Sequence, residues 1–320
     1  MLRYTPHNTF EKNFNGGNMN IAEKLELAIK ANETGSADGA YSLTHNGKTL
    51  QKQTCMTNEE WSRLVFAIKT NKTQPNAYAE YSEGRVGELS EKSGRPPRMA
   101  SYGSSSRMIY KLSADKAGFH YRKKLPAAIG GGVILDGFFE DDTRRVLVET
   151  KCRELYSKKA STASERYREL YEYLNSRMLG NINIEMQPSG AEGYMNVDFF
   201  ADGERLERFD LKQMISHLLG IATGLLKGSL EPKQTDFIYL LYDPTELGME
   251  RNVQEAVDCI YERACYECNL IDFAELFRAV LEFLNEHKFK SKMVEYELDG
   301  AVLNFTFTLA TQDFYPILLQ

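Results

Sequence analysis

The sequence VILDGFFEDDTRRVLVETK, from Val133 to Lys151, contains two apolar runs separated by an acidic and polar segment. Runs rich in Val, Ile, Leu and Phe are typical of β-strands, and the polar centre predicts a hairpin with a two-residue turn at Asp142-Thr143. That turn pairs Asp136 with Glu149, so both side chains lie on one face with Cβ atoms about 5 Å apart. Lys151 lies two residues after Glu149 and shares the same face.

Two carboxylates directly opposite each other destabilise a sheet unless something compensates their charge. Mg²⁺ is one such compensation, since it binds through one or two carboxylates together with waters and substrate phosphate. Lys151 could then hold or help to deprotonate an attacking water, or stabilise charge on a phosphate. The alternative is a surface hairpin edge in which Asp136-Gly137 is itself a turn. Asp/Glu-x-Lys alone is a weak pattern, and this chain contains it four times.

Hydrophobic periodicity predicts a set of helices and strands around this hairpin. We expect helices at 21–31, 58–69 (with Asn58 as the cap), 104–116, 164–178 and 209–228, and two more in the 253–284 region. We expect a hairpin over 194–209 that turns at Asp202-Gly203, a buried strand at 235–244 and a last hairpin that turns at Asp299-Gly300. This order predicts an α/β (mixed α+β) fold with one central mixed sheet flanked by helices.

The net charge of -6 does not by itself indicate a nucleic-acid-binding protein, but the distribution of charge does. Nine Lys and Arg residues and a single acid, Asp115, lie between Lys92 and Lys124. This basic segment predicts either a face that binds a phosphate backbone or a solvated surface. Within it, Arg107 follows a serine-rich helix start, which indicates either a phosphate contact or an ordinary serine cap.

The 320 residues suffice for a sizeable core. The first residues contain no apolar core like that of a secretory signal, and the longest apolar run near the middle is too short to cross a membrane. The five cysteines are an odd number without the spacing of a metal cluster. We therefore expect reduced thiols in a cytoplasmic protein without a membrane partner.

Several motifs resemble the PD-(D/E)XK nuclease superfamily, which has the restriction-endonuclease-like fold. Beyond the Asp-Glu-x-Lys set, the sequences VETKCRELY and FDLKQMISHLLGI and the SSSR helix start are similar to an uncharacterised bacterial restriction-endonuclease-like family. The resemblance spans about Arg98 to Pro244. It implies a nuclease core at 96–245, a helical and polar extension at 1–95, and C-terminal helices with a β-hairpin at 246–320 packed on the core.

The resemblance also assigns roles to residues. Asp136 and Glu149 correspond to the two acids of the motif and Lys151 to its lysine, while the carbonyl of Thr150 would complete the ligation of Mg²⁺ or Mn²⁺. Leu135 stands where the motif has its proline. Gln213 would be an accessory active-site residue, although Asp210 and Gln213 also fit a capping box. Two further residues have two interpretations each. His217 is a satisfied helix histidine or a ligand. Glu154 orients Lys151 or the waters of the metal, or it is a solvated glutamate of a first helical turn.

Together these features predict a Mg²⁺-dependent nuclease that hydrolyses phosphodiester bonds, with DNA as the expected substrate and restriction or DNA processing as its role. The nucleic-acid backbone would bind to Arg95, Arg98, Arg107 and Lys111 of the basic segment. A homodimer would supply two sites for cutting both strands. The alternative is an inactive nucleic-acid-binding or assembly protein that retains the nuclease fold.

Overall fold

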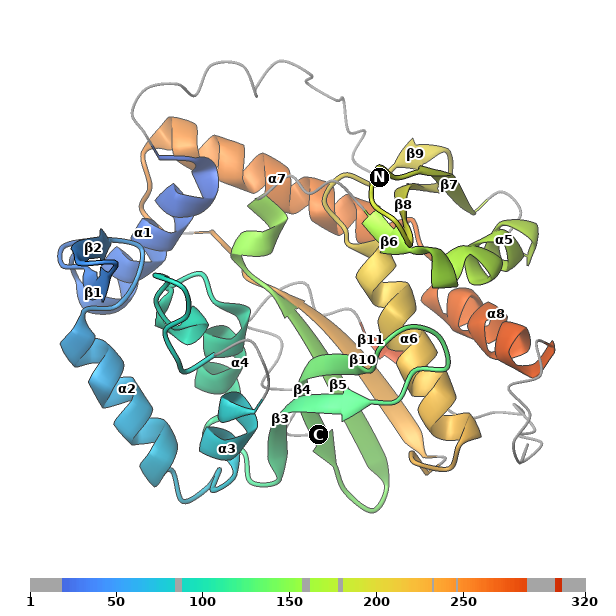
Figure 1. Ribbon diagram of the computed structural model, residues 1–320, viewed down its shortest axis with the longest axis horizontal. Helices are drawn as coiled ribbons and strands as arrows, with labels where there is room; N and C mark the ends of the chain where they lie inside the picture. Colours follow the sequence, from blue (N-terminus) through green and yellow to red (C-terminus); the bar gives the residue numbers. More distant parts are fainter. Residues whose placement is uncertain are drawn as a thin grey trace.

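The computed structural model describes residues 19–83, 88–156, 162–177, 181–231, 233–245, 247–286 and 303–306 (Figure 1). The helices are α1 (Ile21–Thr34), α2 (Asn58–Thr70), α3 (Ala77–Ser82), α4 (Ser105–Ser113), α5 (Arg168–Arg177), α6 (Leu211–Leu226), α7 (Arg251–Asn269) and α8 (Phe273–Glu286). Short 3-10 turns cover Arg98–Ala100 (η2), Arg153–Tyr156 (η3) and Glu165–Tyr167 (η4). None of the helices in these residues is long and apolar enough to cross a membrane.

A five-stranded mixed sheet forms the centre of the molecule, in the order β11-β10-β5-β4-β3. Its strands are β3 (Phe119–Leu125), β4 (Val133–Glu140), β5 (Arg144–Lys151), β10 (Gln234–Leu241) and β11 (Leu303–Thr306). The pairs β3-β4 and β4-β5 are antiparallel, while β5-β10 and β10-β11 are parallel. The apolar run of β10 is buried, as expected for a strand inside a sheet covered on both faces. These features confirm the predicted α/β class.

The β4-β5 hairpin has the predicted turn and register. Glu140 pairs with Arg145, and the ladder continues to Gly137 and Val148. It stops one residue before Asp136, which also has no backbone pair on β3, where Arg122 interrupts the ladder with a positive φ of 54°. Asp136 therefore lies where β4 separates from β5 and where its pairing with β3 is interrupted for one residue before it resumes at Leu135.

A second, antiparallel sheet lies apart from the central one, in the order β6-β8-β7 with β9 beside β8. Its strands are β6 (Thr162–Ser164), β7 (Ile182–Pro188), β8 (Tyr194–Ala201) and β9 (Glu204–Arg205). The predicted turn at Asp202-Gly203 is confirmed, with φ values of 48° and 78°. The prediction of one single sheet was wrong, because β8 pairs with β6 and β7, which the sequence analysis did not predict as strands, instead of joining the central strands.

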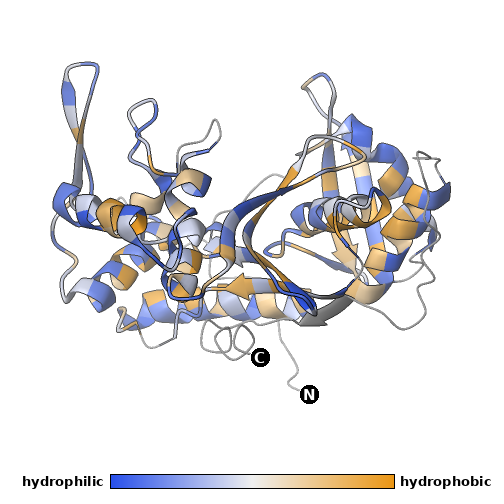
Figure 2. Cartoon of the chain, turned by 90° about the horizontal axis from the view of Figure 1, so that it is seen from below, coloured by the Kyte–Doolittle hydropathy of each residue, from blue (hydrophilic) through white to orange (hydrophobic). Residues whose placement is uncertain are grey.

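Helix α6 packs against the central sheet and against α8, and the apolar residues in Figure 2 gather on the sheet and on the helix faces turned to it. Gly220 makes the close approach of α6 to β4 feasible, since a Cβ there would lie 3.1 Å from Cγ2 of Val133. The cap of α6 is Asp210, whose side chain accepts a hydrogen bond from the Gln213 amide. The helix therefore begins at a defined residue beside the ends of β5 and β10.

The first described residues are packed against the rest of the chain. Helix α1 contacts both α7 and η3, and a small hairpin of β1 (Tyr41–His45) and β2 (Lys48–Lys52) turns at Asn46-Gly47. Helix α2 is capped by Thr57, whose Oγ1 accepts from the Glu60 amide, so the expectation that Asn58 is the cap was wrong. The Asn58 side chain instead bonds the backbone of β1. The hairpin predicted at Asp299-Gly300 lies outside the described residues.

Candidate active site at the ends of strands β4 and β5

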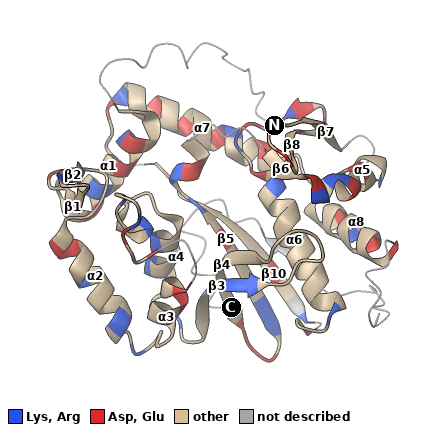
Figure 3. Cartoon of the chain, in the orientation of Figure 1, with Lys and Arg blue, Asp and Glu red and all other residues tan. Residues whose placement is uncertain are grey.

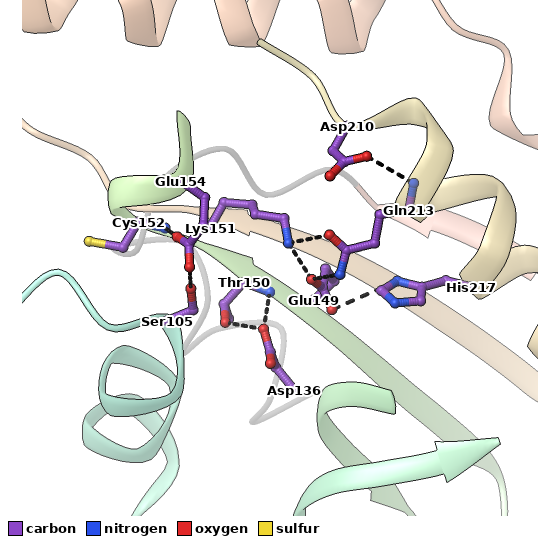
Figure 4. A network of polar contacts seen from close by, with 10 residues as sticks. All are labelled: Ser105, Asp136, Glu149, Thr150, Lys151, Cys152, Glu154, Asp210, Gln213 and His217. Atoms are coloured by element: carbon purple, nitrogen blue, oxygen red, sulfur yellow. Dashed lines mark hydrogen bonds and ion pairs between the residues drawn. The ribbon is translucent and has the colours of Figure 1, made fainter. Parts of the chain in front are cut away.

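Glu149, Lys151 and Gln213 form a closed triangle of hydrogen bonds (Figure 4). The Nζ atom of Lys151 donates to Oε1 of Glu149 at 2.5 Å and to Oε1 of Gln213 at 2.7 Å. The Nε2 atom of Gln213 donates to the same Glu149 oxygen at 2.6 Å. Strand β5 supplies the carboxylate and the ammonium on one face, and helix α6 supplies the amide, so three predicted residues converge at one point.

Asp136 lies beside this triangle and is held by Thr150. Its Oδ2 atom accepts hydrogen bonds from the Thr150 amide at 3.0 Å and from the Thr150 hydroxyl at 2.6 Å. Burial and the nearby charge of Glu149 raise the pKa of Asp136 to about 7, although Lys151 and the bonds from Thr150 act in the opposite direction. A carboxyl group with this pKa indicates a site that would gain from a cation.

Glu149 and Lys151 are both buried, and their charges depend on each other. Burial raises the pKa of Glu149, while the ion pair with Lys151 opposes that shift. Burial alone would lower the pKa of Lys151, but Glu149 and Asp136 outweigh it and raise that pKa. Lys151 is therefore a stable ammonium at neutral pH. The site combines one cation with two carboxyl groups.

His217 lies one helical turn after Gln213 and points at the same carboxylate. Its Nδ1 atom is 3.7 Å from Oε2 of Glu149, and the imidazole is 3 % exposed. Burial and the charge of Lys151 lower the pKa of His217 to about 3, so the ring is neutral. Both this Nδ1 and Oε2 of Glu149 are buried without a hydrogen-bond partner in the described structure. Both interpretations of His217, a satisfied helix histidine and a ligand, stay predictions.

Gln213 has two connections at once. Its backbone amide donates to Oδ1 of Asp210 at 3.0 Å, which confirms Asp210 as the cap. Its side chain does not return to the cap, as a full capping box requires, but reaches Glu149 and Lys151. The cap thus fixes the first turn of α6, and the first turn places the Gln213 amide in the site.

Both carboxylate oxygens of Glu154 accept hydrogen bonds, and its charge contributes to the raised pKa of Lys151. Its Oε1 accepts from the Ser105 hydroxyl at 2.9 Å and its Oε2 from the Cys152 amide at 3.0 Å. It therefore connects the start of α4 to the chain that follows β5. All five cysteines lie in the described part of the chain and are free thiols, and Cys265 and Cys268 are residues of helix α7.

The donor set suits a hard divalent cation that keeps most of its own waters. Among the described residues, no group of three or more His, Cys, Asp or Glu side chains is arranged to hold a metal ion. Mg²⁺ does not need such a group, since one or two carboxylates with waters and phosphate are sufficient. The buried, unbonded Oε2 of Glu149 and the raised pKa of Asp136 are the two observations that fit a cation here.

A cleft of about 530 Å³ opens beside Lys151 and Glu154. Its other walls are β8, β9, the loop before α6 and the first turn of α6. Three further cations line it, namely Arg205, Arg208 and Lys212, together with the acids Glu154, Asp198, Glu207 and Asp210. The sequence analysis missed these cations, although their proximity in sequence to Gln213 was a usable signal.

Four of the nine Lys and Arg residues of the basic segment form ion pairs with acids. Arg107 is buried and bonded to Glu33, and Lys111 lies 2.9 Å from the same carboxylate. Arg98 and Arg122 both approach Glu88, at 3.7 and 2.7 Å. Figure 3 shows Lys and Arg residues on α4 and β3.

None of Arg95, Arg98, Arg107 and Lys111 lines the cleft beside Lys151. The burial of Arg107 favours a structural role for that residue over a phosphate contact. Arg95 is exposed and pairs through its backbone with Lys92.

Comparison of the chain with protein-family models, with curated proteins and with solved structures gave no match.

Proposed function

We propose that this protein is a metal-dependent nuclease that hydrolyses phosphodiester bonds, with DNA as the first substrate to test. The observation that carries the proposal is the set of Asp136, Glu149 and Lys151, joined by Gln213, at the edge of a cleft. Paired carboxyl groups beside an ammonium, with one buried carboxylate oxygen unbonded, suit the binding of a cation and a phosphate. The resemblance to PD-(D/E)XK nucleases agrees with these roles.

Each side chain has a role that follows from its environment. Asp136 and Glu149 would hold Mg²⁺ or Mn²⁺, and the Thr150 carbonyl is the third ligand that the resemblance suggests. When bound, such an ion supplies positive charge that polarises the phosphate and lowers the pKa of a water. Lys151 has a raised pKa, so it acts as a hydrogen-bond donor and a positive charge and not as a base. Gln213 keeps the Lys151 ammonium directed at the site.

The chemistry is the addition of water across a P–O bond. The water oxygen forms a bond to phosphorus, the bond to the leaving sugar oxygen breaks, and one proton passes to that oxygen. Negative charge accumulates on the phosphate oxygens in the transition state, and Lys151 would stabilise it. The nearby Arg205, Arg208 and Lys212 are candidates for contacts with the flanking phosphates.

The test is cleavage of supercoiled plasmid, linear duplex, single-stranded DNA and RNA by the full chain with Mg²⁺, Mn²⁺ or EDTA. We expect cleavage with metal and none with EDTA. Lys151→Ala should reduce the rate by at least about 100-fold, as loss of a donor to the transition state does in other enzymes. Lys227→Ala is the matched control, since Lys227 is an exposed lysine at the other end of α6.

Two outcomes would contradict the proposal. One is a wild-type protein that cleaves none of the four substrates with either metal. The other is a Lys151→Ala variant that cleaves as fast as wild type, which would assign the activity to a contaminant. If the wild type does not cleave but binds nucleic acid, the alternative of an inactive nucleic-acid-binding protein with this fold takes its place.

A further inference from the structure

His217 and Glu149 present to each other two buried atoms that lack hydrogen bonds. The Oε1 atom of Glu149 accepts from both Lys151 and Gln213, whereas Oε2 accepts from none of the described residues. The nearest ring nitrogen, Nδ1 of His217, is 3.7 Å away and is itself unbonded. A buried polar atom without a partner is destabilising, so two such atoms facing each other require an explanation.

The chemistry of the two groups leaves one favourable arrangement. An ionised carboxylate oxygen only accepts hydrogen bonds, and a neutral imidazole donates from one nitrogen and accepts at the other. The contact is attractive only if Nδ1 carries the hydrogen. A shortening of about 0.8 Å from the present 3.7 Å would bring the two atoms to an ordinary N–H···O distance of about 2.9 Å.

We propose that His217 is a positioning residue, whose Nδ1–H donates to Oε2 of Glu149 and, together with Gln213 on Oε1, sets the orientation of that carboxylate. Helix α6 thus supplies two side chains, four residues apart and therefore on one helix face, to the two oxygens of one acid. The inference rests on the proposed function, because the orientation of the Glu149 carboxylate matters only if Glu149 and Asp136 hold a cation together. A direct ligand role suits His217 less well, because Mg²⁺ and Mn²⁺ prefer carboxylate, carbonyl and water oxygens to imidazole nitrogen.

Two variants separate this role from simple packing. In His217→Asn the side-chain amide nitrogen can take the place of Nδ1 and keep the donor. In His217→Leu the apolar volume is kept and the donor is lost. Outer hydrogen bonds to ligating groups change metal affinity by about 10- to 100-fold. We therefore expect His217→Leu to weaken Mn²⁺ binding about 10-fold and His217→Asn to restore most of that loss.

The first measurement uses a variant only to assign one signal. In ¹⁵N-detected NMR of the metal-free full chain, the signal of His217 is assigned among the five histidines by its loss in His217→Asn. We expect a neutral ring with the hydrogen on Nδ1. A ring with the hydrogen on Nε2 overturns the proposal, because Nδ1 would then be a second acceptor facing Oε2.

The second measurement is the affinity for Mn²⁺, determined by electron paramagnetic resonance in the absence of nucleic acid. Equal loss in His217→Leu and His217→Asn, or no loss in either, overturns the positioning role, and so does a wild type that binds no Mn²⁺. The wild type and the two variants can follow the expected order of Mn²⁺ affinity while the wild type cleaves no substrate. That result contradicts the proposed nuclease but supports the role of His217. The two failures are therefore distinguishable.

Discussion

Asp136 destabilises the metal-free protein at neutral pH. Its pKa of about 7 in the folded state, raised by burial and by Glu149, exceeds the value of about 3.9 for an unfolded aspartate. The folded state therefore binds its proton more tightly, and the free energy of unfolding falls as the pH rises from about 4 to about 7. This loss remains at higher pH unless a cation is present.

Asp136→Asn should therefore stabilise the metal-free protein at high pH. The amide oxygen can still accept the bonds from Thr150, and the like charge is removed. Asp136 is partly exposed, so solvent screens its charge and the effect is modest. We expect the free energy of unfolding to rise by about 1–2 kcal/mol at about pH 8 and to be unchanged near pH 4. Urea unfolding in EDTA across this range measures it. A difference between the variant and wild type that is constant with pH would show that the charge of Asp136 is not its cause.

The same carboxyl group makes metal binding compete with a proton. Below a pH of about 7 a cation must displace the proton of Asp136, so the apparent Mg²⁺ affinity should rise with pH and level off above that value. The change should approach about 10-fold per pH unit below the pKa, because one proton is released. Isothermal titration calorimetry in buffers of different ionisation enthalpy counts that proton. Release of no proton at pH 6 would contradict the coupling.

At the scale of elements, Glu267 connects helix α7 to the loop that leads into α6. Its two carboxylate oxygens accept from the amides of Glu207, Arg208 and Phe209 at 2.8–2.9 Å, and Nε of Arg263 donates to it at 2.7 Å. The side chain is completely buried. Three consecutive amides are thus satisfied by one acid of a distant helix, and this arrangement fixes a wall of the cleft beside Lys151.

Glu267→Gln should lower the free energy of unfolding by about 3 kcal/mol, since it weakens charge-assisted bonds and turns an NH₂ group towards backbone donors. Glu262→Gln, on the same helix but exposed, is the matched control and should change stability by less than about 0.5 kcal/mol. Chemical denaturation of the two variants measures the difference. Equal effects would show that the buried contacts do not carry the stability.

Much of the local structure follows from the sequence, and the errors have identifiable causes. The β4-β5 register and the cap at Asp210 were predicted correctly because turn and cap signals are local. The cap of α2 was placed one residue late, because both Thr57 and Asn58 are good cap residues and only the hydrogen bonds distinguish them. The β1-β2 hairpin was missed despite its Asn46-Gly47 turn signal.

At the scale of the whole molecule, the ion pair of Arg107 and Glu33 joins helix α1 to helix α4. The two terminal nitrogens of the guanidinium, Nη1 and Nη2, approach the carboxylate, and Lys111 adds a second positive charge. The sequence predicted one basic surface because the acidic partners lie outside the segment, with Glu33 74 residues from Arg107 and Glu88 34 residues from Arg122. Long-range pairing of this kind, like the separation of the two sheets, has no local signal.

Arg107→Ala should therefore lower the free energy of unfolding and leave the binding of nucleic acid unchanged. Removal of one partner of a buried pair costs about 3–5 kcal/mol, and Lys111 should reduce this to about 3 kcal/mol. The salt dependence of DNA binding should stay unchanged, whereas loss of a phosphate contact would lower its slope by about one. Arg95→Ala, at an exposed arginine, is the control. If Arg107→Ala is as stable as wild type and its DNA binding depends less on salt, Arg107 contacts the nucleic acid after all.

The parallel pairing of β5 with β10 has a consequence for the order of events during synthesis. Arg145 lies beside Thr235, a partner 90 residues later in the chain. Ribosomes add about 5–20 residues per second, so β5 is made several seconds before the strand that covers it. Gln213 is also made after Glu149 and Lys151, which it holds. The nascent chain therefore carries the acids and the lysine before it can arrange them, and assembly of the site is delayed until α6 and β10 have left the ribosome.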